Sequence, residues 1–272
     1  MKKKYSREFY QPKTSIGSFN NQSLCQTDGR WSRDIMKCSP KCGYLTKALP
    51  LIVNGIKASD PLPWYATLYI LKSGVWEFSC GGSLISESII LSASHCFNGI
   101  SEANVRFALG KIYSNYSIQP DEVNARMYDI TKITRHPLYM DKLGNYGSDI
   151  ALIELNETVA LNDFIHPVCM DWDLDDITSH LKQDQLGLVM GMGVTENDTF
   201  SDTIRVIKLP VLSNEECIKK QPQDFQKYVT FTTFCGGFGN GSGVCNGDSG
   251  SGYVFPIKDD RWALQGLVSL CT

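Results

Sequence analysis

The chain has 272 residues, of which 42% are hydrophobic and 20% charged, and its formal net charge is −3. That length admits one large domain or two small ones, and the hydrophobic fraction is ordinary for a globular core. The slightly acidic charge offers no basic field for nucleic acid or an anionic membrane, and no apolar run approaches the roughly 20 residues of a membrane span.

Residues 1–51 are expected to form a small module and a linker. The opening stretch MKKKYSREFYQPKTSIGSF is basic, but no hydrophobic run follows it, so it is not a secretory signal. Either the protein is cytosolic or the chain is an incomplete version of a longer one, and we favour the second. CQTDGRWSRDIMKC (residues 25–38) resembles the second half of a sushi (complement control) module whose first two cysteines are missing. A disulfide-tied surface loop is the alternative. Residues 1–38 would be the partial module, and residues 39–51 a linker and activation segment.

The cysteines favour disulfides over a metal site. There are ten of them, none forms a CxxC pair, and the four histidines do not cluster with them, so zinc ligation is poorly supported. An even number of well-spaced cysteines is typical of an oxidising compartment. Five N-x-S/T sequons agree with a secreted protein. They begin at Asn21, Asn115, Asn156, Asn197 and Asn240.

From residue 52 onward the sequence predicts β-structure. Short apolar or alternating runs, separated by glycine, asparagine and proline, are typical of a β-barrel or sandwich. They are WYATLYI, SLISESIILSASH, DIALIELN, LGLVMGMG, IRVIKLPVL and RWALQGLVSL. Helical periodicity is weak. SNEECIKK predicts one short helix from Ser213 to Lys220, with Ser213 as its cap and Glu216 three residues later.

Three polar residues at the edges of hydrophobic runs could together carry out acyl transfer. Serine catalysis needs a hydroxyl that attacks, an imidazole that takes its proton and a buried carboxylate that orients the imidazole. Taken singly, His95 in LSASHCF could be a surface or capping group, and Asp149 in YGSDIALIEL a turn residue. Ser249 in NGDSGSG could belong to a tight turn. Together, in this order, the three predict a catalytic triad.

These segments resemble the chymotrypsin-like serine endopeptidases. The resemblance runs from Ile52 to Thr272 through IVNG, SCGGSLIS, SASHC, DIALIEL, GDSGSG and LQGLVS, in that order. It implies an all-β fold of two six-stranded antiparallel β-barrels, preceded here by the small disulfide-tied sushi remnant. It also implies a pocket wall, a closing strand and a terminal helix after the LVS strand, so the second barrel is expected to be truncated at the C-terminus.

The resemblance assigns a role to each site residue. Ser249 would attack a peptide carbonyl, His95 would accept its proton, and Asp149 would hold the histidine tautomer. The backbone N–H groups of Gly247 and Ser249 would form the oxyanion hole, with glycine allowing close approach. Ser269 would lie beside the substrate. No metal or organic cofactor is required.

The resemblance also implies a zymogen. A cut between Leu51 and Ile52 would free an ammonium at Ile52 that turns inward and pairs with Asp248, since an unpaired buried carboxylate is costly. Gly243 stands where trypsin-like members have an aspartate at the base of the specificity pocket. Substrates with apolar side chains such as leucine, phenylalanine or valine are therefore expected, and the match of this pocket to Leu51 makes self-activation plausible.

The disulfide pairing is implied in the same way. The expected pairs are Cys80–Cys96, Cys217–Cys235, Cys42–Cys169, Cys245–Cys271 and Cys25–Cys38.

The sushi remnant, the ALPLIVNG segment and the pocket together resemble the modular serine proteases that initiate insect haemolymph cascades in innate immunity. The expected partners are a protein substrate, namely a downstream protease zymogen, and an upstream recognition protein, with neither nucleic acid nor membrane. The expected location is extracellular. The alternative is a non-catalytic or inactive protease homologue that acts only through binding.

Overall fold

The computed structural model describes residues 42–45, 56–57, 62–120, 122–170, 181–195, 199–238, 243–244 and 246–271. The expected sushi remnant (residues 1–38, with Cys25 and Cys38) lies outside the described residues, as do Leu51, Ile52 and Cys245, and only residues 42–45 of the expected linker are described.

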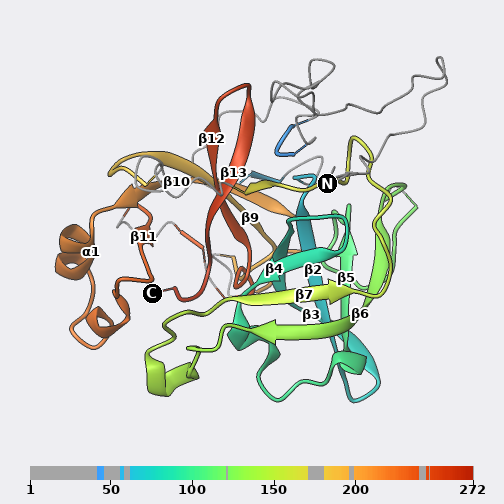
Figure 1. Cartoon of the computed structure of the whole chain (residues 1–272), viewed down its shortest axis with the longest axis horizontal. Helices are drawn as coiled ribbons and strands as arrows, with labels where there is room; N and C mark the ends of the chain where they lie inside the picture. Colours follow the sequence, from blue (N-terminus) through green and yellow to red (C-terminus); the bar gives the residue numbers. More distant parts are fainter. Residues whose placement is uncertain are drawn as a thin grey trace, which may run out of the picture. The chain divides into compact units, whose positions relative to one another are not determined.

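The first half of the described chain is a closed barrel of antiparallel strands, drawn in blue-green to yellow-green in Figure 1. In barrel order the strands are β2 (Tyr65–Lys72), β3 (Val75–Leu84), β4 (Ile89–Ser92), β7 (Ala151–Leu155), β6 (Arg126–Arg135) and β5 (Val105–Leu109). Alternate residues of β7 are buried and exposed, as expected where one face of a strand packs on a core. The expected six-stranded first barrel is confirmed.

The second half is a seven-stranded sheet, with β9, β10, β12 and β13 in yellow-orange to red in Figure 1. Its path runs through β1 (Ile56–Lys57), β10 (Arg205–Leu212), β9 (Leu186–Gly191), β12 (Gly252–Ile257), β13 (Arg261–Leu267) and β8 (Cys169–Met170), and β11 (Cys235–Gly236) pairs with β10. Within the described residues this sheet is open rather than a closed six-stranded barrel. The all-β, chymotrypsin-like architecture is nevertheless confirmed.

One pair in the second sheet departs from the expected antiparallel pattern. Strand β8 runs parallel to β13, with Cys169 opposite Ala263. The segment at Gly43 accounts for this placement, because its N–H donates to Pro167 O at 2.9 Å and its carbonyl accepts from Trp262 N at 2.8 Å. A disulfide between Cys42 and Cys169 fixes the same segment covalently.

The core joins the two sheets. Its main cluster contains Leu68, Phe107 and Ile153 from the barrel together with Met190 and Val254 from the second sheet, and each is at most 1% exposed. A side chain of ordinary size contributes about 1.5–3 kcal/mol when it is buried fully, so this shared cluster holds the two sheets as one body. The candidate active site lies where the two sheets meet.

The described residues contain one α-helix, α1 (Asn214–Lys220). Ser213 is its N-cap and accepts a hydrogen bond from Glu216 N at 3.2 Å, which confirms the helix predicted from SNEECIKK. Short 3-10 helices span Ser94–Phe97, Glu102–Asn104, Asp141–Gly144 and Gln226–Tyr228. No helix in the described part of the chain is long and apolar enough to cross a membrane.

Two further disulfides are present, Cys80–Cys96, which joins β3 to the 3-10 helix at His95, and Cys217–Cys235, which joins α1 to β11. With Cys42–Cys169, these are the three expected pairs whose cysteines are all described. The other two expected pairs each include a cysteine outside the described residues.

Candidate active site

Two paired strands bring His95 and Asp149 to one edge of the barrel. Ser92 at the end of β4 lies opposite Ala151 at the start of β7. His95 lies three residues after Ser92, in the 3-10 helix Ser94–Phe97, and Asp149 stands two residues before Ala151, so both lie at the same edge of the barrel. His95 N donates to Asp149 Oδ1 at 2.9 Å, and Ser94 Oγ donates to Ile150 O at 2.7 Å, which fixes the two segments against each other.

Asp149 is the centre of a charged hydrogen-bond network. Its side chain is only 3% exposed, and its Oδ2 lies 2.6 Å from His95 Nδ1. Ser269 Oγ donates to the same Oδ2 at 2.5 Å. Burial by itself would raise the pKa of Asp149, but the hydrogen bonds from His95 and Ser269 and the charge of His95 hold that pKa below its ordinary value. Asp149 is therefore an ionised, buried carboxylate at neutral pH.

This carboxylate sets the tautomer of the imidazole. An ionised carboxylate only accepts hydrogen bonds, so Nδ1 of His95 must carry the proton on that side. Nε2 of the neutral ring is then unprotonated and able to act as a base.

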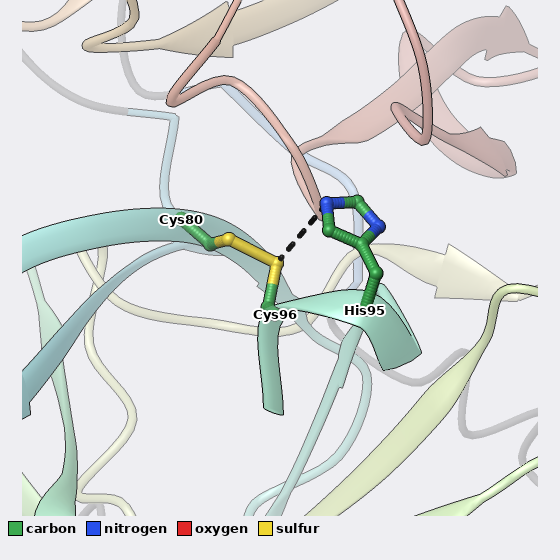
Figure 2. Close-up of side chains that lie close together, drawn as sticks. All are labelled: Cys80, His95 and Cys96. Carbon is green, nitrogen blue, oxygen red and sulfur yellow. Dashed lines mark hydrogen bonds between the residues drawn. A yellow bond between two sulfur atoms is a disulfide. The ribbon is translucent and has the colours of Figure 1, made fainter. Parts of the chain in front are cut away.

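The Nε2 atom has a disulfide as its neighbour. It lies 3.9 Å from Cys96 Sγ, and Figure 2 shows that this sulfur is bonded to Cys80 Sγ. The three potential ligand atoms lie within 4.8 Å of one another. Zinc sites use thiolates, however, and neither sulfur is a thiolate while the disulfide is intact. A disulfide sulfur also has no proton to donate, so this contact leaves the lone pair of Nε2 available.

Ser249 is attached to the same region through its backbone. Its carbonyl accepts a hydrogen bond from Gly81 N at 2.8 Å, and Gly81 follows Cys80, which is bonded to Cys96 beside His95. Among the described residues, Ser249 Oγ makes no hydrogen bond to His95. The side chains of His95, Asp149 and Ser269 are thus joined directly, whereas Ser249 is linked to them by main chain.

The loop before Ser249 can present backbone N–H groups. Gly247 has φ of +93°, and a Cβ there would lie 2.7 Å from the ring of Phe200 and 3.0 Å from Gly193 Cα. Only glycine fits this position without strain. In the described part of the chain, neither Gly247 N nor Ser249 N donates a hydrogen bond, so both could serve an oxyanion.

For Asp248 and Gly243, the structure describes only some of the neighbouring residues. Asp248 Oδ1 accepts from Gly193 N at 2.8 Å, and a Cβ on Gly193 would come within 2.5 Å of Oδ2, so glycine is needed there. Gly243 is exposed, and a Cβ placed on it would meet no atom within 4 Å. Pairing of Asp248 with Ile52 and a pocket floor at Gly243 remain predictions.

Two contacts near His95 and Asp149 were not anticipated. Ser269 was expected beside the substrate, and its hydrogen bond to Asp149 gives it a second place in the network. The ring of Tyr146 meets the ring of His95 edge-on, with centroids 6.2 Å apart, and its backbone has φ of +56°. Its position three residues before Asp149 was the only signal in the sequence, and loop conformation cannot be deduced from that.

The comparisons with known proteins agree with this geometry. Residues 52–271 match the family profile described as Trypsin. The chain is 34% identical over 262 residues to Limulus clotting factor C of Carcinoscorpius rotundicauda, covering 90% of this chain and 25% of that protein. It is 28% identical to the proclotting enzyme of Tachypleus tridentatus (84% of this chain, 61% of that protein). It is 30% identical to phenoloxidase-activating factor 1 of Holotrichia diomphalia (84% and 64%).

The chain thus spans only about a quarter of the length of the first of these relatives. The family match, in contrast, covers nearly all of the chain from residue 52 onward. Together with the closed barrel and the His95–Asp149 pair, it shows that the chain belongs to the trypsin family of chymotrypsin-like serine endopeptidases.

Proposed function

We propose that this chain is an active serine endopeptidase, made as a zymogen, that works in an extracellular proteolytic cascade and cleaves after apolar residues. The observation that carries the proposal is the buried Asp149 carboxylate hydrogen-bonded to His95 Nδ1, next to the loop of Ser249. That arrangement prepares an imidazole base, which a serine nucleophile requires.

The acylation step follows from these groups. Ser249 Oγ attacks the carbonyl carbon of the scissile peptide, and His95 Nε2 takes the hydroxyl proton. The resulting oxyanion accepts hydrogen bonds from Gly247 N and Ser249 N, and Asp149 stabilises the imidazolium. The tetrahedral intermediate then collapses, the C–N bond breaks, and His95 gives its proton to the leaving amine.

Deacylation repeats the sequence with water. His95 takes a proton from the water that attacks the acyl ester, and Ser249 leaves with the returned proton. Each oxyanion donor contributes about 10²–10³ in rate in related hydrolases. The fixed φ of Gly247 is the feature of this chain that would keep its N–H in place.

Activation and specificity are proposed from the sequence. Cleavage between Leu51 and Ile52 would free the ammonium of Ile52 to pair with Asp248. An uncharged pocket base at Gly243 gives a cationic side chain no partner, so apolar side chains are preferred.

The names of the relatives support the cascade. One is named a clotting factor, one a proclotting enzyme and one a phenoloxidase-activating factor. We propose by analogy that the substrate is a downstream protease zymogen and that a recognition protein acts upstream. Disulfides in the described residues agree with an oxidising, extracellular location.

A non-catalytic homologue that acts through binding is the second candidate. The observation in its favour is that, among the described residues, Ser249 Oγ makes no hydrogen bond to His95. Such contacts often tighten only when substrate binds, so the enzyme remains the first choice.

Labelling with a fluorophosphonate separates the two candidates. The full chain is cleaved between Leu51 and Ile52, treated with the probe and mapped by mass spectrometry. We expect a covalent adduct on Ser249 that is lost in Ser249→Ala and strongly slowed in His95→Ala. Failure of the folded, cleaved chain to react would favour the binding protein, and an adduct that survives Ser249→Ala would overturn the assignment.

A further inference from the structure

Two N-x-S/T sequons lie in the described residues, Asn115-Tyr116-Ser117 and Asn156-Glu157-Thr158. We propose that Asn115 and Asn156 are sites of N-linked glycosylation. This inference rests on the extracellular location in the proposed function, because the modification takes place in the secretory pathway. The motif alone is common, and a sequon can be modified only where its asparagine is exposed and its Nδ2 is not used in the fold.

Asn115 lies exposed in the loop between β5 and β6. Its Oδ1 accepts a hydrogen bond from Ser117 N at 2.9 Å, which folds the sequon into a tight turn. Among the described residues, no hydrogen bond uses its Nδ2. The amide nitrogen that would carry the sugar is therefore not committed to the fold.

A buried ion pair stabilises the turn around Asn115. Lys111 Nζ donates to Ser117 O at 2.9 Å and to Glu122 Oε2 at 2.7 Å, and both charged side chains are completely buried. The contacts of Lys111 use a backbone carbonyl and a buried carboxylate. An oligosaccharide on Asn115 would consequently extend into solvent without displacing any of them.

Asn156 is placed in a comparable way just after β7. All three residues of its sequon are exposed, while Leu155 before it and Val159 after it are buried at 6% and 2% exposure. Asn156 N donates to Asp129 O at 3.0 Å, so the main chain is fixed. Within the described part of the chain its carboxamide makes no hydrogen bond.

Two asparagines outside sequons, Asn98 and Asn162, use their Nδ2 atoms in hydrogen bonds. Asn98 Nδ2 donates to Asp141 Oδ2 at 3.0 Å, and Asn162 Nδ2 donates to Ala160 O at 3.5 Å. A bulky substituent on either of these nitrogens would break its hydrogen bond. Within the described residues, the Nδ2 atoms of Asn115 and Asn156 make no such hydrogen bond, so a sugar could be attached there without breaking one.

The chemistry requires a co-reactant of one class, an oligosaccharide linked to a polyisoprenoid diphosphate. The asparagine Nδ2 forms a bond to the anomeric carbon and loses one proton to a base of the transferase. The bond from that carbon to the diphosphate oxygen breaks, and the lipid diphosphate leaves with the electron pair. No oxidation or reduction occurs.

Asn115 also lines a surface cavity of about 670 Å³ whose walls include Trp76, Tyr116 and Phe200. The rings of Trp76 and Tyr116 stack with their centroids 5.5 Å apart, and Phe200 packs against Gly247 in the loop before Ser249. A glycan on Asn115 would stand at the edge of this cavity. It would limit the approach of proteins to that side of the active site more than the approach of short peptides.

Site-specific mass spectrometry tests the proposal. The full chain is secreted from eukaryotic cells behind an added signal peptide, and its glycans are released by an amidase in heavy-oxygen water, which converts each occupied asparagine to labelled aspartate. We expect labelled aspartate at positions 115 and 156. Ser117→Ala and Thr158→Ala should each abolish labelling at their own site, whereas Ser117→Thr and Thr158→Ser should retain it.

Each site is judged separately, with Asn162→Gln as the matched control outside any sequon. Unmodified Asn115 or Asn156 in secreted protein with intact disulfides would overturn the proposal for that site. Reaction with the fluorophosphonate is measured on the same material after cleavage at Leu51. Probe reaction without glycans would contradict only this inference, whereas glycans without probe reaction would contradict only the proposed catalysis.

Discussion

Ser269 and His95 donate to the same oxygen of Asp149, at 2.5 Å and 2.6 Å. This shared acceptor makes Ser269, two residues after β13, a positioning residue for a histidine carried by the barrel. The orientation of the base therefore depends on how the second sheet docks on the barrel.

Replacing Ser269 by alanine should lower kcat with little change in KM. The variant loses a hydrogen bond to a charged, buried group, and we expect a loss of about tenfold, or about 1.4 kcal/mol. Steady-state kinetics on a short apolar peptide would measure it. Ser269→Thr keeps the hydroxyl and should recover most of the activity. An unchanged kcat in Ser269→Ala would contradict the positioning role.

The lowered pKa of Asp149 predicts how stability depends on pH. Its folded pKa lies below the unfolded value, so its contribution is fully present above the unfolded pKa and is lost as pH falls through the folded pKa. The free energy of unfolding of the native chain should therefore exceed that of Asp149→Asn by a constant amount near neutral pH. The difference should shrink below about pH 4. Urea unfolding across this range would measure it, and a difference that grows with acidity would contradict the assignment.

Gly243 predicts the preferred residue before the cleaved bond. A glycine leaves the expected pocket base uncharged, so the cleaved enzyme should favour leucine or phenylalanine over arginine. Gly243→Asp adds a carboxylate that can pair with a guanidinium and should shift the preference toward arginine by at least about tenfold. Profiling with a peptide library measures the shift, and Gly243→Asn supplies the uncharged control. A native preference for arginine or lysine would show that the pocket lies elsewhere.

The buried pair Lys111–Glu122 should matter for stability. Glu122 accepts hydrogen bonds from Lys111 Nζ and from the backbone N–H groups of Ile112, Tyr113 and Gln119. Burial would raise the pKa of Glu122, but the hydrogen bonds from Gln119, Lys111, Tyr113 and Ile112 hold it below its ordinary value. Lys111→Met leaves a buried charge unpaired and should cost about 3–5 kcal/mol of unfolding free energy.

The double variant with Lys111→Met and Glu122→Gln removes both charges and should be more stable than Lys111→Met alone. Denaturant unfolding of the two variants tests this. A single-variant loss below about 1 kcal/mol would mean that water reaches the carboxylate.

Local signals predicted the regular elements well. Alternating burial in Ala151–Leu155 and the cap at Ser213 depend on neighbours within a few residues, so the sequence carries them directly. The bond between Ser269 and Asp149 joins residues 120 positions apart, and the parallel docking of β8 depends on the Cys42–Cys169 disulfide and the segment at Gly43. Such long-range relationships are determined by tertiary packing, which periodicity does not reveal.

The Cys42–Cys169 disulfide spans 127 positions and encloses the bond between Leu51 and Ile52. A chain cut at that bond consists of two polypeptides but remains one molecule, so dilution cannot separate them. Such a covalent tether keeps the cut amino-terminal segment at an effective concentration of about millimolar relative to the polypeptide that begins at Ile52. This value does not depend on the protein concentration. Whatever the amino-terminal segment binds would therefore stay coupled to the activated protease until a reductant breaks one sulfur–sulfur bond.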